Sequence, residues 1–330
     1  MMSKTLELGC LGITWYVASV ACTNGSKVLK RAVSSSQLGF AQLVLSALCA
    51  YVVCDKARLS ISALSATPAE GRRLSRLLWT LAVVFALSFL ALNTSFGYLD
   101  VSLAVTLRAA EPLFAAGATV AMGKPLLPAT LASLVAICAG AAVAASASAP
   151  LGGSISWTGV GLVALANVGF VARSVLAKHI GATFERVRPA VLFFHVCARG
   201  ALVQGALLVV GAARAGGGVD GFRVTLLHPG GAGAAGRGVG SDASSLALPL
   251  VLNGIAFFLY LFCSFTLLAR IPVITHTVAN AMRRPFNVVA AVYLLDESLG
   301  RAKALGIALA CAGATAYSVI QKSAVKQASA

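Results

Sequence analysis

Residues 271–295 read IPVITHTVANAMRRPFNVVAAVYLL, a run long and apolar enough to cross a bilayer that nevertheless holds two adjacent arginines, Arg283 and Arg284. A guanidinium group at the bilayer centre costs from about 2.5 to well over 10 kcal/mol, depending on how far water and lipid relax around it. Two such groups in a row are therefore not explained by stability. The pair predicts an anionic partner, and the simplest partner is a ligand.

The composition places the whole chain in a membrane. Of its 330 residues, 58% are hydrophobic and only 11% are charged, whereas soluble domains carry roughly 25% charged residues. The net charge of +16 does not indicate nucleic-acid binding, because no basic stripe with interleaved aromatic residues lies on a polar domain. The eight cysteines include no CxxC pair and the four histidines have no ligand spacing, so we expect neither a metal site nor a cofactor.

Apolar runs of about 20 residues, separated by charged or turn-rich breaks, predict an all-α integral membrane protein with ten transmembrane helices. The expected spans are residues 8–29, 35–54, 75–96, 99–122, 126–147, 157–178, 188–212, 246–268, 271–295 and 301–320.

The two halves of the chain resemble each other. Val101–Ala144, shifted by 173 positions, lies on Ile274–Tyr317 without a gap, and both ranges hold a CAGA run and, in register, a proline, Pro112 or Pro285. A five-helix unit repeated once must be inverted, because five is odd, and inverted repeats are typical of secondary transporters with a site at the midplane. Convergent packing of alanine-rich and glycine-rich helices is the alternative explanation.

This repeat predicts the organisation of the chain. We expect a first five-helix repeat in 1–147, a linker in 148–156, a second repeat in 157–320 that contains a Gly-rich loop at 213–245, and a basic tail at 321–330. The distribution of Lys and Arg favours cytosolic-type termini. No Arg-rich and Ser-rich leader precedes the first span, so targeting is internal or a leader has been removed.

Within the predicted spans, the positive charges outnumber the negative ones. Arg108 and Glu111 are three residues apart, share a helix face and can pair. Pro112 and Pro285 each remove a backbone hydrogen bond, which predicts kinks where a freed carbonyl needs water or a polar neighbour. The excess charge matches a phosphate dianion, whose oxygens guanidinium groups bind in bidentate fashion. The intramembrane charges are Arg108, Arg173, Arg199, Arg283, Arg284 and Glu111.

Several polar residues in or near the spans have a structural interpretation as well as a functional one. Arg199 can snorkel or pair structurally, and Arg173 can pair with Glu111 instead of lining a site. Lys27 lies near the end of the first span, where an interfacial position is the alternative. Tyr260 offers a phenol donor at mid-span but is equally compatible with a buried core position.

Three stretches carry a family resemblance. Ser102–Pro112 (SLAVTLRAAEP) is similar to SFTHTIKALEP, Pro272–Arg284 (PVITHTVANAMRR) to PLTHAVGNVLKR, and Phe170–Ser174 (FVARS) to FTYRS. These are signatures of the plastid phosphate translocators, the triose-phosphate transporter family of the drug/metabolite transporter superfamily. The chain resembles this family over nearly its whole length except the Gly-rich loop. Further matches are Trp15, Tyr16 and Lys27 on the first span and Asn93 with Ser95 on the third.

The resemblance implies an antiporter, not an enzyme, that exchanges a phosphorylated three- to six-carbon metabolite for inorganic phosphate. Arg108 stands at a phosphate-binding lysine of the family, and Arg283 with Arg284 at its Lys-Arg pair. Tyr260 stands at a tyrosine that contacts the substrate, and Arg173 at an arginine that borders the site. Further candidate site residues are Lys27, Glu111, Arg199 and His276.

The chain also departs from the family pattern. Phe89 and Leu92 occupy positions of a histidine and a threonine on the third helix, and Val105 that of a histidine on the fourth. Because the arginines keep the positive charge, we expect phosphate recognition to survive. We do not expect recognition of a triose to follow in the same way, because these three apolar residues replace polar ones that would surround the carbon atoms of the substrate.

Other functions are compatible with parts of the sequence. A nucleotide-sugar or nucleotide monophosphate antiporter of the Golgi or endoplasmic reticulum is the main alternative, so the expected location is a plastid-type envelope or a Golgi/ER membrane. An anion channel would pass charge without a counter-substrate. An integral-membrane enzyme is disfavoured, because Glu111 is the lone mid-span acid and the spans offer no nucleophile–base arrangement.

Overall fold

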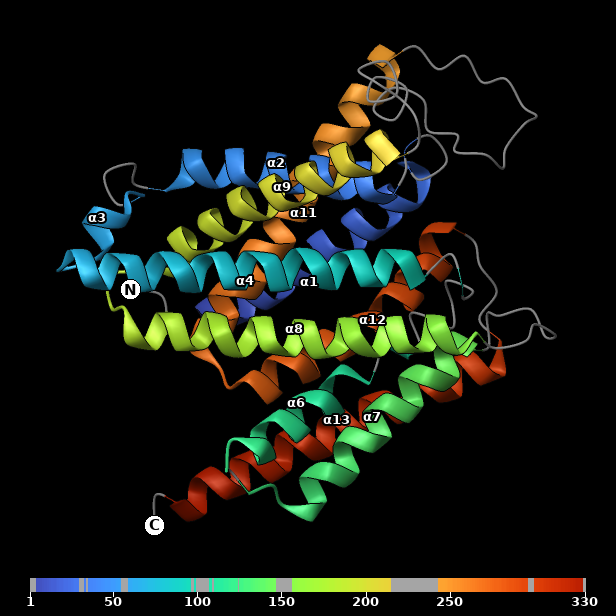
Figure 1. Ribbon diagram of the computed structural model, residues 1–330. Coiled ribbons are helices and arrows are strands. Elements are labelled where there is room, and N and C mark those ends of the chain that lie inside the picture. Colours follow the sequence, from blue (N-terminus) through green and yellow to red (C-terminus); the bar gives the residue numbers. More distant parts are fainter. Residues whose placement is uncertain are drawn as a thin grey trace. The chain divides into compact units, whose positions relative to one another are not determined.

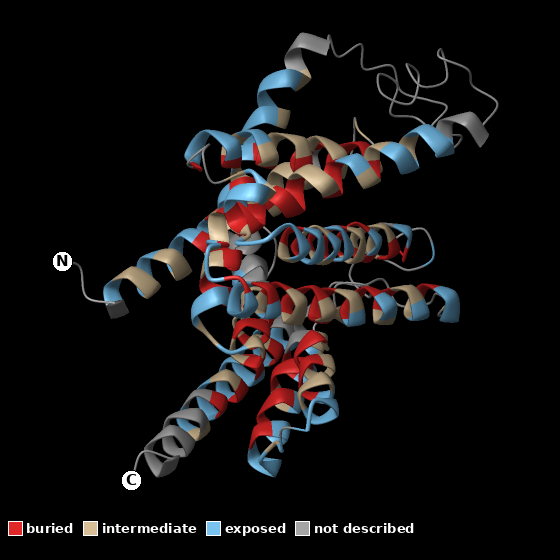
Figure 2. Ribbon diagram, turned by 60° about the vertical axis from the view of Figure 1, so that its left-hand side comes forward, coloured by how far each residue is buried: buried red, intermediate tan, exposed pale blue. Residues whose placement is uncertain are grey.

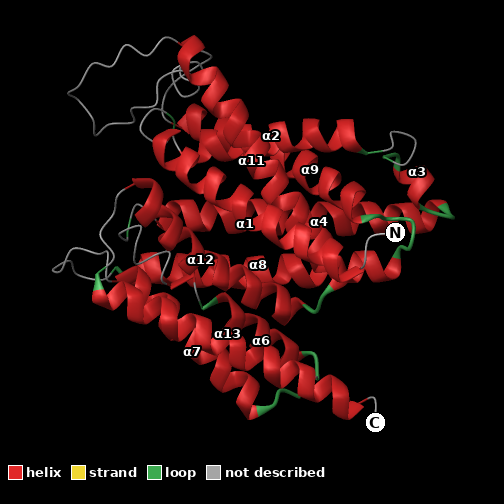
Figure 3. Ribbon diagram, turned by 180° about the vertical axis from the view of Figure 1, so that it is seen from behind, coloured by secondary structure: helices red, strands yellow, loops and turns green. Residues whose placement is uncertain are grey.

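The computed structural model consists of helices joined by turns and loops, and the part of the chain that it describes contains no strand (Figure 3). This confirms the all-α class. The structure describes residues 4–29, 33, 35–54, 59–95, 98, 107–108, 110–123, 125–146, 156–214, 243–295 and 300–328.

Each of the ten predicted spans overlaps a helix labelled in Figure 1, and among the described residues one short additional helix, α3, lies in the break after the second span. Six helices of the described part are long and apolar enough to cross a membrane, namely α1, α2, α4, α8, α9 and α11. The chain is thus a multi-pass membrane protein, and the count of ten spans stays a prediction. The helices are α1 (Lys4–Leu29), α2 (Ser35–Val53), α3 (Ile61–Leu64), α4 (Pro68–Ser95), α6 (Glu111–Ala121), α7 (Pro128–Ser146), α8 (Trp157–Thr183), α9 (Pro189–Arg214), α11 (Ala243–Arg270), α12 (Val273–Leu295) and α13 (Arg301–Ala328).

Helix α4 begins seven residues before the predicted start at residue 75. Its first turn explains the difference: the Glu70 amide donates to Thr67 Oγ1 at 3.2 Å, and the Ala66 amide donates to Glu70 Oε2 at 2.6 Å. This arrangement is similar to a capping box, except that Glu70 accepts from the residue before the N-cap Thr67. Pro68 is at the first helical position, where a missing N–H costs nothing. The polar beginning of α4 is therefore helical, although it is not part of the apolar run.

The fourth predicted span, 99–122, is not one continuous helix. Helix α6 begins only at Glu111, after a turn at Ala110, and residues 99–106 lie outside the described part of the chain. Pro112 accounts for this start, because it cannot donate to the preceding turn and suits a first helical turn.

The chain folds as two compact units, and each takes helices from both halves of the sequence. The first unit comprises Met1–Ala86 and Leu176–Arg270, and the second comprises Leu87–Val175 and Ile271–Ala330. The boundaries of these two units therefore differ from those of the predicted repeats, and the repeats stay a prediction.

In the first unit, α1 packs on α11, and α2 packs on α9 and α11. The ring of Phe193 on α9 is the centre of an aromatic cluster, 5.5–6.0 Å from the rings of Phe258, Phe262 and Phe265 on α11. A buried polar link joins three helices: Gln42 Nε2 donates to Asn253 Oδ1 at 2.8 Å, and Asn253 Nδ2 donates to the carbonyl of Cys22 at 2.9 Å. Buried amides are stable only when paired in this way.

Outward-facing side chains are often apolar. Figure 2 shows exposed residues along the length of most helices, and the large hydrophobic ones among them include Trp157, Val52 and Ile13, which are 81%, 78% and 68% exposed. Such surfaces would be unfavourable in water and are favourable in lipid. The burial pattern thus supports the membrane assignment independently of hydropathy.

In the second unit, α13 lies against α7 through small residues. A side chain at Gly140 would meet the backbone of Ala310 and Gly306, and one at Gly313 would come within 3.0 Å of Ile137. Close backbone approach at glycine is the usual way for helices to associate in lipid. Gly140 and Gly313 belong to the two CAGA runs, so these runs have a direct packing role.

We expect Gly140→Ala to destabilise the protein although alanine favours a helix. The new methyl group would collide with the backbone of α13, and overpacking costs about 1–3 kcal/mol. Gly117→Ala on α6 is the matched control, because nothing lies within 4 Å of the added carbon there and the helix-propensity gain of up to about 1 kcal/mol is the same. Thermal unfolding in detergent should give a lower Tm for the first variant than for the second. Equal Tm values would contradict the α7–α13 contact.

Candidate functional site: a buried carboxylate with arginines

The start of α6 leaves a backbone carbonyl to be satisfied. The Leu107 carbonyl accepts the amide of Ala110 at 3.2 Å and the side-chain Nδ2 of the buried Asn167 on α8 at 3.0 Å. The sequence predicted a polar neighbour for the carbonyl that Pro112 frees, that of Arg108. In the structure, the carbonyl with a polar neighbour is that of the preceding residue, Leu107. Helix α12 is helical from Val273 to Leu295, across Pro285, so the predicted kink there stays a prediction.

Glu111 is the central acid of this region and is only 1% exposed. Its Oε2 accepts a hydrogen bond from Arg108 Nη2 at 3.1 Å, which confirms the predicted pair. The same oxygen accepts from Asn280 Nδ2 on α12 at 2.8 Å. A charge this deeply buried is stable only when paired and hydrogen-bonded, and here one carboxylate atom joins α6 to α12.

The ring of Phe170 on α8 lies close to two arginines. The guanidinium carbon of Arg108 is 4.2 Å from the ring centroid and that of Arg173 is 5.8 Å from it. Both distances fall within the range of cation–π attraction. Phe89 on α4 packs edge-on against the same ring at 5.1 Å. The Phe170 ring thus holds Arg108 by a second contact besides its bond to the carboxylate.

Arg173 is buried, with 5% of its surface exposed, and its Nη2 donates to Ser174 Oγ at 3.2 Å. The Ser174 hydroxyl in turn donates to the Phe170 carbonyl at 2.9 Å. Arg173 is therefore held beside Phe170 by its own helix. The predicted pairing of Arg173 with Glu111 stays a prediction.

Helix α12 has two chemically different faces. Ile274, Val278 and Ala281 belong to the apolar core of the second unit, together with residues of α6, α7, α8 and α13. At 3.6 residues per turn, His276, Asn280 and Arg283 fall on the other face. His276 and Asn280 are 1% and 7% exposed, and Arg283 is partly buried. From the polar face, Asn280 reaches Glu111 of α6.

Arg283 follows Asn280 by one helical turn, and residues three apart are neighbours on a helix surface. The second unit therefore contains Arg108, Glu111, Arg173, His276 and Arg283 of the predicted site. Arg284 belongs to α12 in the same unit, but its side chain lies outside the described part.

The other predicted site residues belong to the first unit. Tyr260 on α11 is partly buried, with its ring 6.1 Å from that of Phe257. Arg199 has local partners: its Nη1 is 2.6 Å from Nδ1 of His195, and its guanidinium lies 5.4 Å from the Trp79 ring centroid. Lys27 is on α1, with a side chain outside the described part.

Sequence reasoning did not single out Asn167 and Asn280, although both contact the site directly. A signal for Asn280 existed, because it lies four residues after His276 and three before Arg283, so the three polar residues recur on one helix face. Asn167 had no comparable signal, since its partner is a backbone carbonyl 60 positions away in the sequence.

An all-helical membrane protein with a buried carboxylate paired to an arginine, and with further arginines in the same unit, has the features of a membrane transporter. The sequence pattern of the Triose-phosphate Transporter family matches residues 6–318, and the chain belongs to this family. It is a membrane transporter and not an enzyme, as the motifs predicted.

Named relatives are translocators of plastids. The chain is 25% identical to "Phosphoenolpyruvate/phosphate translocator 1, chloroplastic" of Oryza sativa subsp. japonica, over 97% of this chain and 73% of the relative. It is 23% identical to "Triose phosphate/phosphate translocator, non-green plastid, chloroplastic" of Brassica oleracea var. botrytis, over 97% and 74%. A solved crystal structure shares the fold with a TM-score of 0.68 at 15% identity, over 96% of this chain and 99% of that one.

Proposed function

We propose that this transporter exchanges a phosphorylated small metabolite for inorganic phosphate by alternating access. The observation that carries the proposal is the excess of arginines around Glu111: Arg108 is paired with it, while Arg173 and Arg283 add further buried or partly buried positive charge. In a medium of low polarity this charge requires an anion. A phosphate dianion supplies both the charge and the oxygens that guanidinium groups bind in pairs.

Arg108 is the residue best prepared for this role. Its Nη2 is bonded to Glu111, its flat face is against Phe170, and its Nε has no hydrogen-bond partner among the described residues. A guanidinium group has five N–H donors, so most of them remain for a phosphoryl group. We assign Arg283 and Arg284 to the same phosphoryl group, and the assignment of Tyr260 stays a sequence-based prediction.

Exchange follows from the electrostatics of the empty site. Without an anion, closure would bring partly dehydrated arginines together, which is unfavourable by several kcal/mol. With phosphate or a phosphate ester bound, the charges balance and the occluded state becomes accessible. The site can then reorient only when loaded, so inward and outward flux are coupled.

For the carried molecule, we propose a three-carbon phosphorylated compound. The names of the relatives mention phosphoenolpyruvate and triose phosphate, and the Phe89–Phe170 pair gives the surroundings of Arg108 an apolar side. A plastid-type envelope is the corresponding membrane. The alternative of a nucleotide-sugar or nucleotide monophosphate antiporter in the Golgi or endoplasmic reticulum predicts a different competition pattern.

The test is uptake of labelled phosphate into liposomes that contain the purified protein. With phosphate inside, we expect uptake at least about tenfold faster than without it, because a site that reorients only when loaded needs a counter-substrate. Equal rates would contradict exchange, and current without counter-substrate would indicate a channel. Competition by phosphoenolpyruvate or triose phosphate, but not by nucleotide monophosphates, is the expected pattern, and the reverse would favour the alternative.

A further inference from the structure

A basic and aromatic surface lies at the beginning of α4, in the first unit and separate from the arginines around Glu111. Its residues recur at helical spacing, so that they share one face, and they line an open hollow of about 800 Å³. We call this surface the α4 arginine face. It consists of Arg72, Ser75, Arg76, Trp79 and Thr80.

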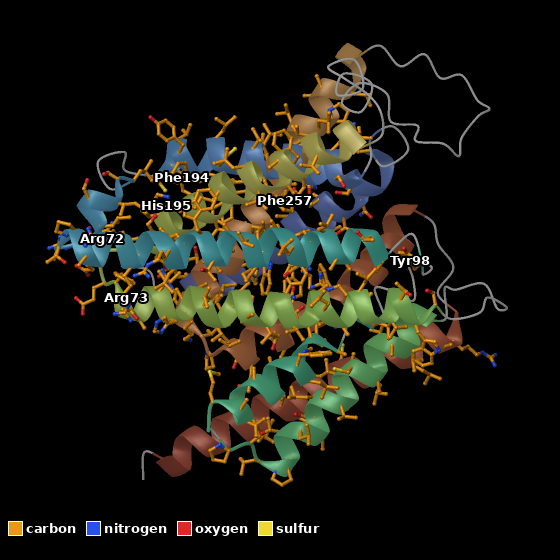
Figure 4. The ribbon with its side chains drawn as sticks, in the orientation of Figure 1. Arg72, Arg73, Tyr98, Phe194, His195 and Phe257 are labelled. Atoms are coloured by element: carbon orange, nitrogen blue, oxygen red, sulfur yellow. The ribbon has the colours of Figure 1, made fainter. Side chains whose placement is uncertain are left out.

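The length of α4 places this face at the membrane boundary. The helix has 28 residues, or about 42 Å, whereas about 20 residues are enough to cross a hydrocarbon core of about 30 Å. The apolar run predicted from the sequence begins at residue 75. Arg72 precedes this run and Arg76 is its second residue, so both lie at its polar end, at headgroup level, and Trp79 falls where tryptophan is typically enriched in membrane proteins. Figure 4 shows Arg72 and Arg73 near this end of α4.

Helix α9 adds another positive charge behind this face. The guanidinium of Arg199 lies 5.4 Å from the Trp79 ring centroid, and its Nη1 donates to Nδ1 of the buried His195. Since arginine only donates, the ring proton of His195 is then on Nε2. Arg199 Nε is buried without a hydrogen-bond partner among the described residues.

The charges of this region are not balanced within the described part of the chain. The ion pairs found there involve other arginines, and none joins a carboxylate to Arg72, Arg76 or Arg199. The three guanidinium groups and the half-exposed ring of Trp79, 42% exposed, form a surface with a cationic side and an apolar side. A ligand that satisfies both sides carries an anionic group attached to an apolar body.

We propose that the α4 arginine face binds the headgroup of an anionic phospholipid. Arg72 and Arg76, one turn apart on α4, hold the phosphodiester, and the Trp79 ring packs against the glycerol and the first methylene groups. Basic surfaces next to membrane spans attract anionic lipids, and the bilayer presents the headgroup directly at this level. A free metabolite phosphate would satisfy the arginines but would not cover the exposed part of the Trp79 ring, 42% of its surface.

The experiment is native mass spectrometry of the full chain in detergent, titrated with phosphatidylglycerol or phosphatidylcholine. We expect the unaltered protein to prefer phosphatidylglycerol and Arg72→Gln/Arg76→Gln to lose roughly ten- to thirtyfold in its apparent affinity, from about one charge interaction per arginine. Arg186→Gln/Arg188→Gln is the matched control. It removes two exposed arginines of the same unit, in the α8–α9 loop, and should keep the preference. Trp79→Ala should weaken binding, and Trp79→Phe should largely restore it.

Three results would overturn the proposal: unchanged phosphatidylglycerol binding by Arg72→Gln/Arg76→Gln, an equal loss in the Arg186→Gln/Arg188→Gln control, or displacement of the lipid by millimolar inorganic phosphate. The last result would identify a free phosphate site instead. If the double variant does not elute as a monodisperse protein, Arg76→Gln alone decides the question, with an expected loss of roughly threefold to tenfold.

Discussion

Replacing Arg108 with alanine is expected to reduce phosphate counter-exchange at least about a hundredfold. Two hydrogen bonds from a guanidinium to a phosphoryl group are worth about 1.5–3 kcal/mol each, and each 1.4 kcal/mol is a factor of ten. The substitution also removes the Nη2 donor from the buried carboxylate of Glu111, leaving Asn280 Nδ2 on the same oxygen. Arg108→Ala thus removes the contacts with the phosphoryl group and also breaks the Arg108–Glu111 pair. Counter-exchange into phosphate-loaded liposomes measures the effect.

One further variant separates the charge of Arg108 from its geometry, and a second serves as a control. Arg108→Lys keeps the charge but cannot form the planar bidentate contact, so we expect a smaller loss, roughly tenfold. Arg186→Ala removes an exposed arginine and should leave exchange unchanged. If Arg108→Ala folds and exchanges phosphate at a rate within threefold of the unaltered protein, Arg108 does not bind the phosphoryl group.

The sequence predicted the helices better than their beginnings. Hydropathy locates apolar runs, but a helix can start in polar sequence when its first turn is capped, as Thr67 and Glu70 do for α4. The opposite error occurred at residues 99–122, where the apolar run crosses a turn. Pro112 was predicted to kink the helix, yet whether a proline bends a helix or begins one depends on the partners of the preceding carbonyls, here Asn167 from another helix.

Spacing within one helix predicted part of the candidate site, whereas contacts between helices could not be predicted from the sequence. The Arg108–Glu111 pair follows from a separation of three residues. The bond from Asn280 to Glu111 joins residues 169 positions apart, and the contact of Arg108 with the Phe170 ring depends on the packing of α8. Such contacts are products of tertiary structure, so a single sequence does not contain them in readable form. Hydropathy likewise did not predict that Arg199 lies between His195 and Trp79.

The Glu111→Gln variant is expected to lower the Tm of the empty protein and to enlarge the shift that phosphate causes. Glutamine keeps the shape and an acceptor oxygen but removes the negative charge that Arg108 shares. Removing one partner of a buried pair costs about 3–5 kcal/mol, because the other charge stays buried. Phosphate at a hundred times its Kd returns about 2.7 kcal/mol by binding to the folded state, and the variant gains more than the unaltered protein because the anion replaces the missing charge.

The same substitution should also separate binding from turnover. In the unaltered protein, the Glu111 carboxylate already neutralises part of the Arg108 charge, which favours release of phosphate. In Glu111→Gln no carboxylate competes for Arg108, so we expect a lower KM for phosphate and a lower maximal exchange rate. A purely structural role of Glu111 would reduce the rate without lowering KM. Glu185→Gln, which neutralises an exposed acid between α8 and α9, should change neither quantity. If the phosphate-dependent Tm shift of Glu111→Gln equals that of the unaltered protein, the carboxylate and the phosphoryl group do not compete for Arg108, and the charge-balance mechanism of exchange is wrong.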